Sequence, residues 1–274
     1  MVKILLIIAI VILVLLLGAG LMANRYVNDR TIPVNEIANK GDRVLVVFAH
    51  PDDEITVAGT LAKLNAKNIP TGVVYLTRGE AGPTGGIVPQ EKLGEERTKE
   101  LRFLKPILGI GYLKIFDYPD SDIKNVQPDE IKKSILDCIA EFKPTIMIGF
   151  DETVGLYGHE DHRLAGLYLH ELLENNDDLN IARHYMVTLP APMIKLALKM
   201  SAMFKERYPK EPEKGLPAPD VAVDISKFGK FKRSVLEAHK TQREILEDVQ
   251  PYGMSIPPSI YYRVFDREYF HLVD

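Results

Sequence analysis

Short runs of Val, Ile and Leu alternate with helical patterns along most of this sequence, and this alternation limits the fold more than any other feature. The runs are continuously apolar, which is typical of parallel strands buried on both faces of a sheet. The predicted strands are residues 43–49, 72–77, 112–116 and 145–150, and the predicted helices are 56–68, 91–108, 128–142 and 160–174. The pattern predicts an α/β fold, with a doubly wound, mainly parallel sheet that carries helices on both faces in a Rossmann-like arrangement.

The C-terminal part of the sequence is less regular. Residues 184–190 and 220–226 are predicted strands, and residues 231–248 are a predicted helix. Residues 193–208 form another helical pattern, in which Met, Leu and Phe alternate with Lys. Core packing is the commoner explanation of that spacing, and the alternative is a helix on a membrane surface or at an apolar substrate mouth. The Pro-rich residues 207–220 are predicted to be a connecting loop.

The N-terminal segment predicts a membrane anchor. Residues 4–23 are 20 residues without a charge, and a helix of that length spans about 30 Å, the thickness of the hydrocarbon core of a bilayer. We therefore expect a single-pass transmembrane helix at 1–23, a polar linker at 24–41 and a membrane localisation. The alternative for 1–23 is a signal peptide, retained or cleaved, although the apolar part of a signal is usually shorter. Basic residues lie on both sides of the run and leave its sidedness open.

Residues 42–274 are enough for one catalytic domain. The 46% hydrophobic content predicts a sizeable core, and a net charge of only −4 argues against a nucleic-acid partner. The single cysteine, Cys138, cannot form an intrachain disulfide and is expected to be buried. The sequence leaves the oligomeric state open.

Two polar clusters follow predicted strands, at residues 50–54 and 157–162. Ligands of open parallel sheets bind in the crevice at the carboxyl ends of the strands, so both clusters are candidates for one site. A dinucleotide is not expected there, because the first turn lacks the Gly-x-Gly-x-x-Gly pattern and its acidic residues would repel a pyrophosphate.

Metal binding explains these clusters better. His50 and Asp53 are three residues apart across a strand-to-helix turn, so both can reach one ion, and His162 can complete the set. Two imidazoles, one carboxylate and an open position suit catalytic zinc, although the same ligands also bind Fe²⁺. Zinc lowers the pKa of its water toward about 7, and Asp52 would be the general base that takes the proton. The alternative for either cluster alone is an ordinary capping or surface pair.

Two motifs resemble a known family. "AHPDDE" at 49–54 and "HEDH" at 159–162 are similar to the motifs of the PIG-L/LmbE-like zinc N-deacetylases. Weaker matches are LTRGEAG at 76–82, ERTKEL at 96–101, DYPDSD at 117–122 and KRSVLEAHKTQ at 232–242. The resemblance covers most of residues 42–274 and implies an LmbE-type deacetylase domain there. It implies a zinc-dependent hydrolase that removes an N-acetyl group from an N-acetylglucosamine-type sugar conjugate, with a lipid-linked conjugate as one alternative.

The resemblance also implies roles for single residues. It makes His50, Asp53 and His162 the zinc ligands and Asp52 the general base that activates the zinc-bound water. Glu54 matches no catalytic role and is expected to begin the following helix, where a carboxylate interacts favourably with the helix dipole.

The other implied roles lie around this centre. A charged His159 would face the oxyanion of the tetrahedral intermediate, and Asp161 would orient an imidazole. Tyr157 would lie beside the reacting centre, or simply pack there as a buried aromatic. Arg97 and Asp120 would hold the sugar or the group attached to it.

Two other functions stay open. One is a metal-dependent amidase that acts on a non-sugar substrate. The other is a non-catalytic, membrane-anchored glycan-binding protein on the same scaffold. Loss of Asp52 or of a metal ligand would mark the second, and the sequence has lost neither.

Overall fold

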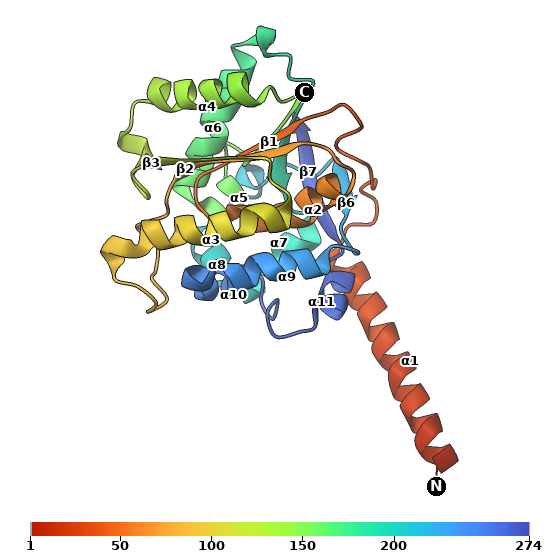
Figure 1. Cartoon of the computed structure of the whole chain (residues 1–274). Coiled ribbons are helices and arrows are strands. Elements are labelled where there is room, and N and C mark those ends of the chain that lie inside the picture. The colour runs from red at the N-terminus through yellow and green to blue at the C-terminus, as the bar shows by residue number, and fades with distance from the viewer. Residues whose placement is uncertain (1, 274) are drawn as a thin grey trace.

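The computed structural model describes residues 2–273 and contains a seven-stranded sheet in the order β3-β2-β1-β4-β5-β7-β6 (Figure 1). Strands β1 to β5 pair in parallel, whereas β7 pairs antiparallel with both β5 and β6. The strands are β1 Val44–Phe48, β2 Thr71–Thr77, β3 Tyr112–Tyr118, β4 Ile146–Gly149, β5 Arg183–Thr188, β6 Val221–Asp224 and β7 Arg267–Val273. The predicted doubly wound, mainly parallel α/β sheet is confirmed.

Helices cover both faces of this sheet (Figure 1). Alternate residues of β1 supply the two cores: Val46 and Phe48 belong to one, and Leu45 and Val47 to the other. This double burial explains why β1 is apolar at every position. The first core lies under α2 Ala58–Ala66, α3 Leu93–Leu108 and α9 Gly229–Ala238, and the second under α4 Pro128–Phe142 and α6 Glu160–Glu174.

Shorter helices complete the C-terminal part. They are α5 Gly155–Gly158, α7 Ala191–Met200, α8 Ala202–Arg207, α10 Arg243–Val249 and α11 Pro258–Val264. The predicted helix 193–208 is broken at Ser201, whose hydroxyl accepts a hydrogen bond from the Phe204 N–H and so caps α8. Phe204 packs in the core, but none of the side chains of α7 is buried.

The predicted transmembrane anchor is contradicted by the structure. Among the described residues, no helix has both the length and the apolar character that a membrane span requires. Helix α1 Val2–Val27 instead ends against the domain, where Asn24 Nδ2 donates 2.9 Å hydrogen bonds to the carbonyls of Arg263 and Val264. The predicted membrane localisation is therefore wrong, because hydropathy alone treated the apolar run as separate from the domain on which its last turns pack.

The segment after α1 also lies on the domain. Ile37 and Ala38 are each 1% exposed, and Val34 forms an isolated parallel bridge with Ala222 of β6. Residues 28–41, which the sequence analysis placed in a linker, thus contribute to the core beside the sheet edge.

Candidate active site

The first polar cluster is a tight turn between β1 and a short 3-10 helix, η1 Asp53–Thr56. Asp52 has a φ of 115°, a left-handed conformation that is uncommon for a residue other than glycine. The His50 N–H donates a 2.8 Å hydrogen bond to Asp53 Oδ2. The turn therefore leaves both His50 and Asp53 at the carboxyl end of the central strand.

The three predicted metal ligands converge. His50 Nδ1 lies 3.1 Å from His162 Nε2, and His162 Nε2 lies 3.0 Å from Asp53 Oδ1. His50 Nδ1 is 3.7 Å from Asp53 Oδ2. Two ligand atoms of a tetrahedral zinc ion, each at about 2.0–2.2 Å, lie roughly 3.5 Å apart. The spacing and the chemistry of these three donors fit one such ion.

His162 is oriented by its other nitrogen. His162 Nδ1 lies 3.2 Å from the Gly155 carbonyl, and its ring stacks on Phe150 with centroids 4.2 Å apart. An Nδ1–H donated to that carbonyl leaves the Nε2 lone pair facing Asp53. Gly155 has a φ of +64°, and a Cβ there would lie 2.4 Å from the Arg163 nitrogen, so this turn requires glycine.

Two carboxylates contact the Nε2 nitrogen of His50, on the side of the ring away from Asp53 and His162. His50 Nε2 lies 3.0 Å from Asp120 Oδ1 and 3.3 Å from Asp161 Oδ2. Backbone N–H groups fix both acids, since Ala81 donates to Asp120 and Ser121 to Asp161. Burial lowers the pKa of His50, but these two hydrogen bonds outweigh it and raise that pKa to about 10. With Nε2 engaged, Nδ1 is the nitrogen that faces the other ligands.

His159 approaches the same centre from the start of α6. The ligand atoms of His50, His159 and His162 all lie within 4.8 Å of one another, and so do those of His50, Asp120 and Asp161. We favour the set that contains Asp53, because the carboxylate approaches both imidazoles: Oδ1 lies 3.0 Å from His162 Nε2, and Oδ2 lies 3.7 Å from His50 Nδ1.

The geometry favours a neutral His159. Its Nδ1 accepts a hydrogen bond from the Asp161 N–H, so in the neutral ring the proton lies on Nε2. Burial, followed by the neighbouring imidazoles of His162 and His50, lowers the pKa of His159 to about 3. A neutral ring of this kind can still donate one hydrogen bond, although we expected a charged one.

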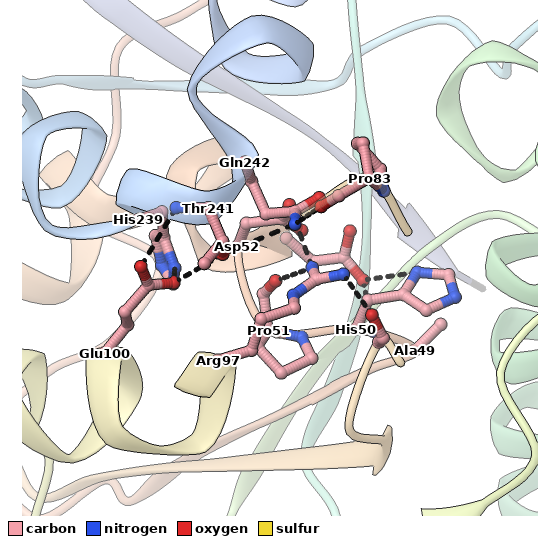
Figure 2. Close-up of polar contacts among 12 residues, drawn as sticks. Ala49, His50, Pro51, Asp52, Pro83, Arg97, Glu100, His239, Thr241 and Gln242 are labelled. Atoms are coloured by element: carbon pink, nitrogen blue, oxygen red, sulfur yellow. Dashed lines mark hydrogen bonds and ion pairs between the residues drawn. The ribbon is translucent and has the colours of Figure 1, made fainter. Parts of the chain in front are cut away.

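Asp52 is paired with a buried arginine. Asp52 Oδ2 lies 3.0 Å from Arg97 Nη2, and Arg97 also donates to the carbonyls of Gly79 and Pro51 (Figure 2). Burial raises the pKa of Asp52 to about 6, although Arg97 opposes this shift. A carboxylate with that pKa is suited to accept a proton near neutral pH. Arg97 is only 3% exposed, and its predicted contact with a sugar stays a prediction, as does that of Asp120.

Tyr157 packs beside the ligands. Its ring lies edge-on to His162, with centroids 5.2 Å apart, and 5.8 Å from Phe204. Tyr157 lines the same cavity as Asp52 and Asp53. Both roles expected for it, a packed aromatic and a group near the reacting centre, are compatible with this position.

A buried network that the sequence analysis did not identify supports the turn. Glu54 is fully buried and accepts hydrogen bonds from the Asp52 N–H at 3.0 Å and the Tyr75 hydroxyl at 2.6 Å. Its other oxygen contacts His239 Nε2. Glu100 in turn accepts hydrogen bonds from the N–H and hydroxyl of Thr241 (Figure 2). The weak match at 232–242 was the available signal for this network, and Glu54 is structural through these contacts rather than through a helix dipole.

A second buried pair, Lys232 with Glu268, holds the segment that follows Glu54. Lys232 Nζ donates 2.6 Å hydrogen bonds to the Ile55 carbonyl and to Glu268 Oε1. Glu268 also accepts the N–H groups of Gly59 and Thr60 at the start of α2. The segment that carries the ligands is thus tied to both α9 and β7.

The contact between His239 and Glu54 predicts a pH-dependent loss of stability in His239→Gln. Burial lowers the pKa of His239, but Glu54 outweighs it and raises the pKa from 6.5 to about 10. A raised pKa stabilises the fold fully below about pH 6.5, and this contribution is lost as the pH rises through 10. We expect the variant to lose about 3 kcal/mol of unfolding free energy near pH 6 and progressively less toward pH 10.

Urea unfolding of both proteins at several pH values measures this difference. His184→Gln is the matched control, because burial lowers the pKa of His184 to about 3 and keeps that ring neutral over this range. The loss in the control should not change between about pH 8 and 10, where His184 is neutral in both the folded and the unfolded protein, whereas the loss in His239→Gln should shrink over that range. A His239→Gln difference that is constant or grows with pH would contradict the charge pair.

Comparison with known proteins identifies the family of this chain. Residues 45–173 match the PIG-L family, described as GlcNAc-PI de-N-acetylase. The chain is 30% identical over 203 residues to a probable N-acetyl-alpha-D-glucosaminyl L-malate deacetylase 2 of Bacillus anthracis, covering 73% of this chain and 80% of the relative.

Solved structures share the fold at lower identity. The N,N'-diacetylchitobiose deacetylase of Pyrococcus horikoshii superposes with a TM-score of 0.62 and 19% identity, over 85% of this chain and 84% of that one. The 4-carboxy-2-hydroxymuconate hydratase of Pseudomonas putida superposes with a TM-score of 0.60 and 18% identity, over 85% of this chain and 96% of that one. From the family match and the identity with the Bacillus anthracis relative, we conclude that the chain belongs to the PIG-L/LmbE-like family of N-deacetylases.

Proposed function

We propose that this protein is a zinc-dependent hydrolase that removes the acetyl group from an N-acetylglucosamine-type sugar conjugate. The observation that carries the proposal is the convergence of His50, Asp53 and His162, whose closest side-chain atoms lie 3.0–3.7 Å apart pair by pair, with the Asp52 carboxylate on the same turn. The relatives support the substrate class, since the Bacillus anthracis protein is named for a glucosaminyl malate and the Pyrococcus horikoshii protein for diacetylchitobiose.

The proposed roles follow from the contacts. A divalent ion held by His50, Asp53 and His162 would polarise the amide carbonyl and make a water acidic at neutral pH. Asp52, held by Arg97, accepts the proton of the attacking water and can return it to the leaving amine.

The groups around the ligands complete the proposal. His159 donates from Nε2 to the developing oxyanion, where one well-placed donor is worth about 3–4 kcal/mol. Asp120 and Asp161 hold His50 in its ligating orientation. Tyr157 forms the wall beside this centre.

The fold alone does not select this reaction, because a hydratase shares it. The alternatives are an amidase with a non-sugar substrate and a non-catalytic glycan-binding protein. Two histidines and a carboxylate would also accept Fe²⁺, but the pairing of Asp52 with Arg97 supplies the base that hydrolysis needs. A lipid-linked conjugate is one version of the proposed substrate.

Asp52→Asn is expected to keep zinc and lose turnover. The amide cannot accept the proton, whereas the three ligands are unchanged, so acetate release should fall by about 10²–10⁴-fold. Acetate release from N-acetylglucosamine conjugates and zinc content are measured on the same preparation. Asp137→Asn, on the exposed face of α4, is the control and should match the parent. Full turnover in Asp52→Asn would reject Asp52 as the base.

His162→Ala is expected to lose zinc. Removal of one of three protein ligands leaves a set too small for tight binding of a catalytic ion. Elemental analysis after dialysis against a weak chelator measures the zinc that stays bound. His170→Ala, on the same helix and away from the cluster, should keep the parent's content. Parent-level zinc in His162→Ala would contradict its assignment as a ligand.

A further inference from the structure

An apolar cavity of about 400 Å³ opens directly onto the candidate active site. Asp52, Asp53, Tyr157 and His162 line one part of it. The remaining wall comes largely from α7, α8, α10 and α11 and from the loop between the last two, all on one side of the sheet (Figure 1). The apolar lining includes Leu196, Met200, Leu246, Val249, Ile256 and Ile260.

We propose that this cavity binds an unbranched alkyl group of the substrate, next to the amide that is hydrolysed. This inference rests on the proposed function and narrows its substrate class to sugar conjugates that carry such a chain. The chain would belong either to the acyl group on the amide nitrogen or to the aglycone on the sugar.

Away from the candidate active site, the charged side chains on the cavity wall bind other parts of the protein. Lys232 and Glu268 bind each other at 2.6 Å. Arg267 donates to the carbonyls of Asp29 and Ile32. A sugar hydroxyl placed deep in the cavity would face mainly apolar side chains and would lose its hydrogen bonds to water.

The apolar wall is only partly covered within the described part of the chain. Helix α7 contains no buried residue, although Met193 and Leu196 lie on the cavity. At the rim, Met200 is 40% exposed, Ile260 58% and Tyr252 62%. An alkyl chain would remove this surface from water, which is the main favourable term in apolar binding.

The position of the cavity identifies its occupant as part of the substrate. Asp52, Asp53 and His162 lie on its wall, so a group bound there is within reach of the reacting amide. A cavity of this volume also lies within the usual range of about 300–1,000 Å³ for small-molecule sites. A group covalently attached to the amide or to its sugar would therefore occupy the cavity and the metal centre together.

Two substrate series test the proposal on the zinc-loaded full chain. In the first, the acyl group on glucosamine is lengthened from acetyl through butyryl, hexanoyl and octanoyl. In the second, the amide stays acetyl and the alkyl aglycone is lengthened in the same steps. Each methylene that enters the cavity should raise kcat/KM by about fourfold, corresponding to about 0.8 kcal/mol, until the cavity is full. The series that shows this rise identifies which group carries the chain.

A matched pair of variants tests whether the dependence on chain length arises in this cavity. Leu196→Gln puts an amide on the cavity wall and should flatten the dependence of kcat/KM on chain length. Leu198→Gln makes the same change on the same helix but away from the cavity, and should retain the parent's dependence. An equal response in both variants would overturn the assignment of this cavity.

Measuring binding without turnover distinguishes a failure of the alkyl-cavity proposal from a failure of the deacetylase proposal. Calorimetry with the chain-bearing products of both series, the alkyl glucosaminides and the alkanoates, measures affinity whether or not the amide is hydrolysed. Amide hydrolysis whose kcat/KM does not depend on chain length in either series overturns the alkyl proposal and leaves the deacetylase. Chain-dependent binding without hydrolysis of any substrate rejects the proposed reaction and keeps the cavity assignment, and the absence of both overturns both.

Discussion

The turn that carries His50, Asp52 and Asp53 depends on a fully buried contact between Glu54 and His239. Pro51 has no N–H to donate, and Asp52 adopts a φ of 115°, which is uncommon for a residue other than glycine. Backbone hydrogen bonds such as Asp53 N–H to the His50 carbonyl close the turn, and the Glu54 carboxylate accepts the Asp52 N–H. An unfavourable backbone conformation of this kind persists only where its surroundings define it completely, and here α9 and β2 supply those surroundings.

Buried charge pairs surround this turn, and we interpret their role as fixing its conformation rather than adding net stability. Replacing a buried ion pair by apolar residues is often neutral or stabilising, but breaking one by removing a partner costs about 3–5 kcal/mol. We expect this rule to apply to the pairs of Arg97 with Asp52 and Lys232 with Glu268. We interpret both pairs as selecting one arrangement of the turn, because any shift would separate largely buried charges.

The convergence of His50, Asp53 and His162 could be predicted from the sequence, whereas the buried contacts of Glu54 that support their turn could not. Continuous apolar runs place the ends of β1 and β4 at one sheet edge, so His50 and His162 had to lie near each other. The contact between Glu54 and His239 joins residues 185 positions apart and depends on side-chain directions that spacing does not encode. Hydropathy likewise cannot show that the last turns of α1 dock through Asn24, and this is why the membrane prediction failed.

The combination of a polar centre and an apolar cavity follows from the strand order. In the order β3-β2-β1-β4-β5, the chain leaves β1 toward one side of the sheet and β4 toward the other, which opens a crevice between their carboxyl ends. Helix α2 returns from β1 on one face and α6 from β4 on the opposite face. The side of α6 brings His159 and His162 to the crevice, whereas α7, α8, α10 and α11 close its other side with aliphatic groups. One topological feature therefore places the proposed metal ligands and the proposed base against an apolar wall. The sequence of the loops after the strands determines the chemistry of the polar centre. The C-terminal helices determine which groups fit against the apolar wall.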